Sequence, residues 1–186
     1  MTSNAAYLIR TESPIGPLEL TSDGEHITSL SIAREGRLPL EEQPQHPVPV
    51  LEEAVRQLSE YFAGTRRDFD LPLKPEGTAF QRDVWARLGE LGWGEYISYG
   101  ELGLGIGKPG SARAIGGAVG ANPLPIIIGC HRVLAGDKRL TGYSGGNGIP
   151  TKVWLLDHEG IQHRGARESA RLTSASGSTP LLEFPQ

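Results

Sequence analysis

Two short predicted helices joined by Lys108-Pro109-Gly110 constrain the fold of this chain more than any other feature. The first opens at Ser98-Tyr99-Gly100-Glu101, which has the form of a capping box. The second is predicted from Ser111 to Ala121 and is halted by Asn122-Pro123. A glycine costs a helix about 1 kcal/mol relative to alanine. The many small residues of the second helix therefore indicate that another surface approaches the backbone of this helix closely. That surface is either a neighbouring helix of the same chain or DNA, which the second helix of a helix-turn-helix commonly contacts.

The first 77 residues have a different pattern, typical of a small sheet with a helix. Residues 15–20 and 27–32 alternate apolar and polar side chains, and Asp23-Gly24 forms a turn between them. A helix is then predicted to end at Gly64, from an apolar stripe in its sequence: Leu51, Val55, Leu58 and Phe62. We therefore predict an α/β (α+β) fold with an N-terminal α/β domain and linker over 1–77 and a mostly helical domain over 78–164. Residues 165–186 are polar and non-periodic and are predicted to be a flexible tail.

Further helices are predicted in the second domain from their end signals. Thr78-Ala79-Phe80-Gln81 has the form of a second capping box. The helix that it opens is expected to bury four apolar side chains: Phe80, Val84, Leu88 and Leu91. A last helix is predicted to begin at Thr151 and to be closed by Gly160.

The charge distribution keeps DNA open as a partner. The net charge of −4 argues against nucleic acid, but residues 1–77 hold thirteen acidic and seven basic side chains, whereas residues 78–160 hold seven and eight. No apolar stretch approaches the ~20 residues of a membrane helix, and the N-terminus lacks a secretion signal. We expect a cytoplasmic protein with no membrane partner.

Cys130 is the single cysteine of the chain, so it has no disulfide partner within the chain and no Cys-rich zinc site can form. Burial as a small hydrophobe is the usual role of a free cysteine. Its neighbour His131 favours a nucleophile instead, because the reactive thiolate needs a nearby base or cation to form near neutral pH. The other histidines show no ligand spacing, and we predict no metal site.

These segments together are similar to the O6-alkylguanine-DNA alkyltransferases, also named methylated-DNA–protein-cysteine methyltransferases. The resemblance is strong over residues 78–161 and covers the N-terminal part only by general layout. It rests on the following stretches in the family's order: residues 78–81 with Val84-Trp85, Ser98-Tyr99, residues 112–116, Asn122-Pro123, residues 130–133, residues 142–146, and Lys152 with Leu155-Leu156 and Glu159-Gly160.

The resemblance implies a direct-reversal repair reaction. Cys130 would accept a methyl or larger alkyl group from guanine O6, and possible substrates extend to O4-alkylthymine. The thioether is stable, so each molecule would act once and without a cofactor. His131 would draw the thiol proton through a water and Glu159 would orient the imidazole, which implies a thiol pKa below the free value. Tyr99 would donate to guanine N3, and Asn122 would fix the turn before the active-site strand.

The resemblance also implies how DNA is bound. A stacked guanine must rotate out of the duplex to reach the thiol, and Arg113 would fill the vacated space. The recognition helix of a winged helix-turn-helix would enter the minor groove, largely independently of sequence. A monomer is expected, with a ribonuclease-H-like layout of the N-terminal domain. The other implied DNA contacts are Ser98, Ala112, Ala114, Gly116 and Gly117. The implied base pocket comprises Val133, Tyr143 and Ser144.

Two other functions are compatible with parts of this pattern. An alkyltransferase-like protein would bind and flip the damaged base without transfer, but such proteins lack the acceptor cysteine. A cysteine hydrolase could use Cys130 and His131, although side chains adjacent in sequence rarely point at one another. The sequence also departs from the family at Gly129, where a proline is usual, and we expect this glycine to loosen the backbone before the thiol.

Overall fold

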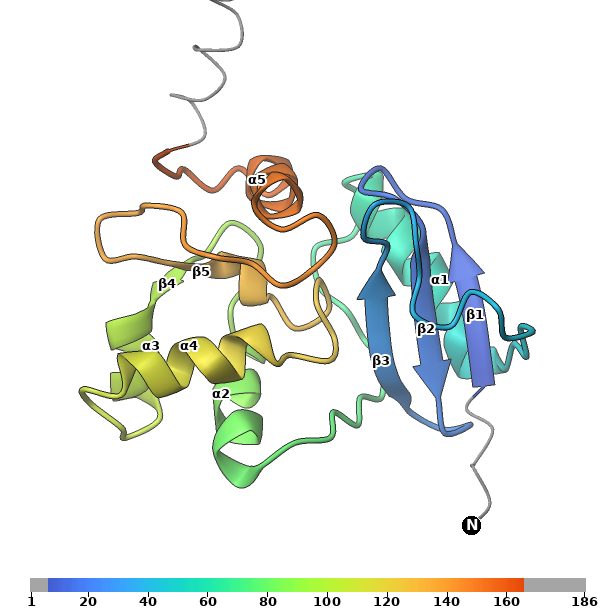
Figure 1. Cartoon of the computed structure of the whole chain (residues 1–186), viewed down its shortest axis with the longest axis horizontal. Helices are drawn as coiled ribbons and strands as arrows, with labels where there is room; N and C mark the ends of the chain where they lie inside the picture. Colours follow the sequence, from blue (N-terminus) through green and yellow to red (C-terminus); the bar gives the residue numbers. More distant parts are fainter. Residues whose placement is uncertain (1–6, 166–186) are drawn as a thin grey trace, which may run out of the picture.

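A computed structural model describes residues 7–165 of the chain. Its N-terminal part is a three-stranded antiparallel sheet in the order β1-β2-β3, formed by β1 (Tyr7–Thr11), β2 (Leu18–Ser22) and β3 (Ile27–Ile32). Every residue of the central strand β2 is buried. Helix α1 (Pro49–Phe62) packs on this sheet (Figure 1).

The buried face of α1 is rotated slightly from the predicted stripe. Leu51 and Leu58 are buried as expected, but Val55 and Phe62 are only half-buried. Ala54 and Tyr61 complete the buried face instead. The structural reason is that Tyr61 points toward the C-terminal part of the molecule, whose packing the apolar spacing within one helix does not reveal.

The C-terminal part is mostly helical, and both predicted capping boxes are present. Its helices are α2 (Ala79–Gly89), α3 (Tyr99–Gly105), α4 (Ala112–Gly120) and α5 (Ile149–His158). Thr78 and Gln81 exchange side-chain-to-backbone hydrogen bonds of 2.9 and 3.2 Å, and the equivalent bonds of Ser98 and Glu101 have the same lengths. These reciprocal bonds satisfy backbone donors that the first helical turn leaves free.

Two predicted features of these helices are wrong in detail. Leu91 lies beyond the end of α2 and, like Phe80, is half-buried. Helix α5 starts at Ile149 rather than Thr151. Pro150 is compatible with the first turn because the N–H that proline lacks would have no helical partner there. Gly160 follows α5 with a φ of 72°, a left-handed conformation that glycine adopts without a Cβ penalty.

Packing within the protein does not account for the glycines of α4. This helix packs against α2 and α3 through Ile115, Ala118 and Val119, and Trp85 Nε1 donates a 2.8 Å hydrogen bond to the Ala118 carbonyl. A Cβ added at Gly117 or Gly120 would meet no atom of residues 7–165 within 4 Å. The small residues on this face therefore leave an open surface, which favours the second of the two predicted explanations.

The segment around the thiol is a turn rather than the expected strand. Cys130–Arg132 form a single 3₁₀ turn, η1, and the short strand β5 (Val133–Leu134) follows it and pairs in parallel with β4 (Ile97–Ser98). A cluster of buried apolar side chains runs from the N-terminal sheet through α1 and α2 to Cys130 and α5. The two parts therefore share one hydrophobic core that includes Cys130, and Figure 1 shows them side by side. None of the described helices is long and apolar enough to cross a membrane.

Candidate active site

Glu159 organises the residues that follow Cys130. This carboxylate is buried at the end of α5 and accepts a 2.8 Å hydrogen bond from Nε2 of the fully buried His131. It also accepts bonds of 2.8 Å from Arg132 Nε and 3.0 Å from Arg132 Nη2. Arg132 in turn donates to the carbonyl of Leu91. The 3₁₀ turn thus brings two consecutive side chains onto one carboxylate, as the sequence predicts for His131.

The hydrogen bond to Glu159 fixes the protonation of the His131 ring. A carboxylate only accepts, so Nε2 carries a hydrogen, and in the neutral ring Nδ1 then keeps its lone pair. Nδ1 is buried and has no hydrogen-bond partner among residues 7–165. Burial lowers the pKa of His131, and this outweighs the opposing effect of Glu159. The ring is therefore neutral at pH 7, and Nδ1 can accept a proton.

The carboxylate itself is ionised. Burial alone would raise the pKa of Glu159, but the hydrogen bonds from His131 and Arg132 and the charge of Arg132 outweigh burial and hold this pKa at about 2, below its ordinary 4.5. A buried charge needs this degree of pairing to be tolerated.

The thiol differs from the prediction. We expected a pKa below the free value, whereas burial raises the pKa of Cys130, which is 4% exposed. The side chains of Asn122 and Tyr143 and the charge of Lys152 act in the opposite direction without cancelling the effect of burial. The prediction was wrong for the free protein because desolvation disfavours the thiolate more than these neighbours stabilise it.

Asn122 holds the turn that leads to the thiol. Its Nδ2 donates a 2.8 Å hydrogen bond to the Ile128 carbonyl, and its Oδ1 accepts a 3.0 Å bond from the Leu124 amide. The backbone between α4 and Cys130 is therefore closed by one side chain at two points. The structure places Asn122 at the predicted turn, although η1 and not a strand follows it.

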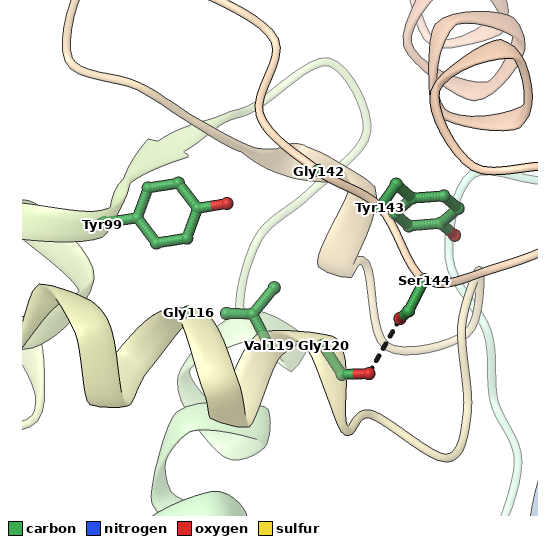
Figure 2. Close-up of a pocket in the computed structure, with 7 residues that line it drawn as sticks. All are labelled: Tyr99, Gly116, Val119, Gly120, Gly142, Tyr143 and Ser144. Carbon is green, nitrogen blue, oxygen red and sulfur yellow. Dashed lines mark hydrogen bonds between the residues drawn. The ribbon is translucent and has the colours of Figure 1, made fainter.

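A cavity of about 360 Å³ lies between α3, α4 and the segment before α5, and Figure 2 shows its lining. Four predicted site residues line it: Tyr99, Gly116, Tyr143 and Ser144. The Ser144 hydroxyl donates a 2.8 Å hydrogen bond to the Gly120 carbonyl and ties the loop to α4 (Figure 2). Val133 does not line this cavity; it is fully buried in β5.

Cys130 lines a second cavity, also of about 360 Å³, which shares Gly120 and Ser144 with the first. Its walls include Ser29 and Ser31 of β3, Asn122 and Ser144. The cavity that holds Tyr99 and the cavity that Cys130 lines are therefore neighbours.

Lys152 lies in one of the stretches that resemble the family, but no role was predicted for it. Its side chain is 1% exposed, and Nζ donates a 2.7 Å hydrogen bond to the carbonyl of Val133. Nζ also lies 3.4 Å from Thr141 Oγ1. Burial lowers the pKa of Lys152 to about 8. The burial of Lys152 marks it as a residue of the site, and this burial could not be predicted from its position in the sequence.

Tyr61 is a further residue that the sequence did not indicate. Its hydroxyl, at the end of α1 and 98 residues from Glu159, donates a 2.8 Å hydrogen bond to Glu159 Oε1. Its ring packs against Phe62, Phe69, Trp93 and His158. The N-terminal part therefore contributes a donor to the carboxylate that orients His131.

The predicted DNA-contacting residues lie mostly on the open face of α4. Arg113, Ala112, Ala114 and Gly117 are exposed, and Gly116 is half-buried beneath the ring of Tyr99. Ser98 differs in that its side chain caps α3. Within residues 7–165, no group of three or more His, Cys, Asp or Glu side chains is arranged to hold a metal ion.

Gly129 is more constrained than we expected from its sequence. It is buried with a φ of −69°, a value that proline also adopts. An added Cβ, however, would lie 2.9 Å from Cδ of Arg132, whose guanidinium is held by Glu159. The space beside Gly129 is therefore occupied by a side chain of the site.

Comparisons with known proteins agree with this geometry. Residues 79–161 match the 6-O-methylguanine DNA methyltransferase DNA binding domain, and residues 6–75 match the ribonuclease-like domain of the same proteins. A methylated-DNA–protein-cysteine methyltransferase of Haemophilus influenzae is 44% identical over 86% of this chain and 89% of its own. A constitutive one from Bacillus subtilis is 38% identical over 85% and 98%.

Solved structures confirm the predicted mixed α/β fold. A Mycobacterium tuberculosis O6-methylguanine methyltransferase has a TM-score of 0.75 at 38% identity, covering 88% of this chain and 99% of its own. The M. tuberculosis OGT structure in complex with DNA also has a TM-score of 0.75, at 41% identity over 83% and 93%. The two matched domains together span most of the described residues. This chain belongs to the 6-O-methylguanine DNA methyltransferase family.

Proposed function

We propose that this protein repairs DNA directly by moving an alkyl group from guanine O6 to Sγ of Cys130. The observation that carries the proposal is the single cysteine, which is followed in the sequence by a neutral histidine whose ring is oriented by a buried carboxylate. The family of the chain supports the same reaction.

The proposed step needs only groups that the chain and the substrate supply. Nδ1 of His131 takes the thiol proton, through a water, and Sγ then forms a bond to the alkyl carbon as the C–O6 bond breaks. The bonding electrons leave with guanine, toward which Tyr99 donates a hydrogen bond. The product thioether is stable, so each molecule reacts once and no cofactor takes part.

The raised pKa of Cys130 suits this order of events. In the free protein the thiol is neutral, and the neutral His131 ring offers Nδ1 as an acceptor for the thiol proton. A thiolate is therefore generated mainly when a substrate occupies the site, and nonspecific alkylation or oxidation of the free protein is limited. The ionised Glu159 stabilises the imidazolium that proton transfer creates.

The open face of α4 is the proposed DNA surface. Its small side chains allow close approach to the minor groove of duplex DNA, and the exposed Arg113 replaces the rotated guanine in the stack. These contacts involve backbone and groove shape, so binding is largely independent of sequence, and one chain suffices as a monomer. The cavity beside Tyr99 is within the range of small-molecule sites and receives the rotated base.

Transfer of a labelled methyl group tests this function. The protein is mixed with duplex DNA that contains one O6-methylguanine carrying a labelled methyl, and the protein is then examined by mass spectrometry. We expect one methyl on Cys130, unmodified guanine in the DNA, and no label on the Cys130→Ser variant. A parallel duplex with O4-methylthymine shows whether that base is accepted.

Other outcomes identify the alternatives. Binding of the modified duplex with no label on the protein would contradict transfer and indicate a damage-binding protein. Hydrolysis of a thioester substrate with many turnovers per Cys130 would instead indicate a cysteine hydrolase.

A further inference from the structure

Tyr99 is the end of a chain of polar side chains that begins in the core. Its hydroxyl lies 2.6 Å from Thr141 Oγ1, and Thr141 Oγ1 lies 3.4 Å from Nζ of Lys152. Tyr99 belongs to α3, Lys152 belongs to α5, and Thr141 lies in the loop that precedes α5. Figure 2 shows the Tyr99 ring extending across the cavity toward Gly142, the residue that follows Thr141.

The donors and acceptors of these side chains fix which residue donates to which in the hydrogen-bond chain. The ammonium of Lys152 only donates hydrogen bonds, and its 1% exposure leaves it to protein acceptors, namely the Val133 carbonyl and Thr141. Thr141 has one hydrogen. When Thr141 accepts from Lys152 and donates to Tyr99, the Tyr99 hydrogen is free to point into the cavity. The Thr141 and Tyr99 hydrogens then each have an acceptor once a base occupies the cavity.

We propose that Thr141 and Lys152 are positioning residues that strengthen Tyr99 as the donor to the departing guanine. This inference rests on the proposed function. As Sγ bonds to the alkyl carbon and the C–O6 bond breaks, guanine accepts the Tyr99 proton at a ring nitrogen. The Thr141 proton moves to Tyr99, one Lys152 proton moves to Thr141, and the site is left with a neutral lysine amine, so the proton count balances.

A hydrogen-bond chain that ends in a buried cation has a physical advantage over an isolated tyrosine. Each hydroxyl that accepts a bond becomes a better donor, and the effect is larger where water is excluded. The charge that develops on the leaving base is thereby stabilised by a preorganised group rather than by solvent. Lys152 also holds the Val133 carbonyl, so Thr141 is the member of the chain that can be altered with least effect on the fold.

The test compares Thr141→Val, which keeps the shape and removes the hydroxyl, with Thr141→Ser, which keeps the hydroxyl. Two single-turnover rates are measured for each: methyl transfer at saturating O6-methylguanine duplex, and alkylation of Cys130 by iodoacetamide. Iodide leaves without a proton, so iodoacetamide reports the thiol without the leaving-group step. We expect Thr141→Val to slow methyl transfer by about tenfold and iodoacetamide by less than about twofold, and Thr141→Ser to transfer methyl at close to the original rate.

A double-mutant cycle with Tyr99→Phe completes the experiment. If Thr141 acts through Tyr99, Thr141→Val has no further effect on methyl transfer once the Tyr99 hydroxyl is gone. Equal slowing of both reactions by Thr141→Val would overturn the proposal, because it would place Thr141 in the fold or beside the thiol. Unchanged methyl transfer, or independent effects in the cycle, would also overturn it. Failure of the unaltered protein to transfer methyl would instead refute the proposed function.

Discussion

Replacing Tyr61 with phenylalanine removes the hydrogen bond by which the N-terminal part holds the active-site carboxylate. The bond from the Tyr61 hydroxyl to Glu159 Oε1 is 2.8 Å long and buried. Phenylalanine keeps the ring, so contacts with the surrounding aromatic side chains remain. The substitution therefore isolates one hydrogen bond between helices that are far apart in the sequence.

The expected cost follows from the number of donors on the carboxylate. A hydrogen bond to a charged group contributes about 1.5–3 kcal/mol. Oε1 still accepts from His131 and Arg132 after the change, so we expect the lower part of that range, about 1.5–2 kcal/mol. For a protein of this size, that corresponds to a fall of roughly 3–8 °C in melting temperature.

Urea denaturation of both proteins measures this difference, and Tyr7→Phe is the matched control. Tyr7 is 41% exposed, so loss of the same oxygen there should change the free energy of unfolding by less than about 0.5 kcal/mol. If Tyr61→Phe is no more destabilising than Tyr7→Phe, the Tyr61 hydroxyl does not stabilise Glu159 and our account of the contact between the two parts is incorrect.

Three further predictions concern the site and its DNA surface. Arg113→Ala should slow methyl transfer from duplex DNA much more than reaction with free O6-benzylguanine, because only the duplex requires base rotation, which costs a few kcal/mol; equal slowing would assign Arg113 to the chemistry or the fold. The pKa of Glu159 is lowered from 4.5 to about 2, so its ionised form contributes stability above pH 4.5 that is lost as the pH falls through about 2. The melting temperature of the Glu159→Gln variant should therefore fall less than that of the unaltered protein as the pH is lowered from 4.5 to about 2. An equal fall in both proteins would contradict the assignment. The rate of iodoacetamide reaction of the free protein should have a midpoint above the ordinary pKa of a thiol, because burial raises the pKa of Cys130; a midpoint below that value would restore the original prediction.

Local signals in the sequence determined much of the architecture. The capping boxes at Thr78 and Ser98 are formed by residues three positions apart, so their hydrogen bonds follow from the sequence alone. Asn122 likewise holds a turn of its own neighbours. The sequence also indicated the pairing of His131 with Glu159, but only through resemblance to a family, because 28 residues separate the two.

The tertiary structure decided the electrostatics of the site. Tyr61 reaches Glu159 across 98 residues, and Lys152 reaches the Val133 carbonyl across 19. The direction of the Cys130 pKa shift was mispredicted for the same reason. A neighbour in sequence supplies a charge or a hydrogen bond, but the cost of ionising a thiol depends on how much water remains around it. That amount is set by segments that tertiary packing brings to Cys130, among them α5 and the side chains of Asn122 and Tyr143, and no local pattern of residues records it.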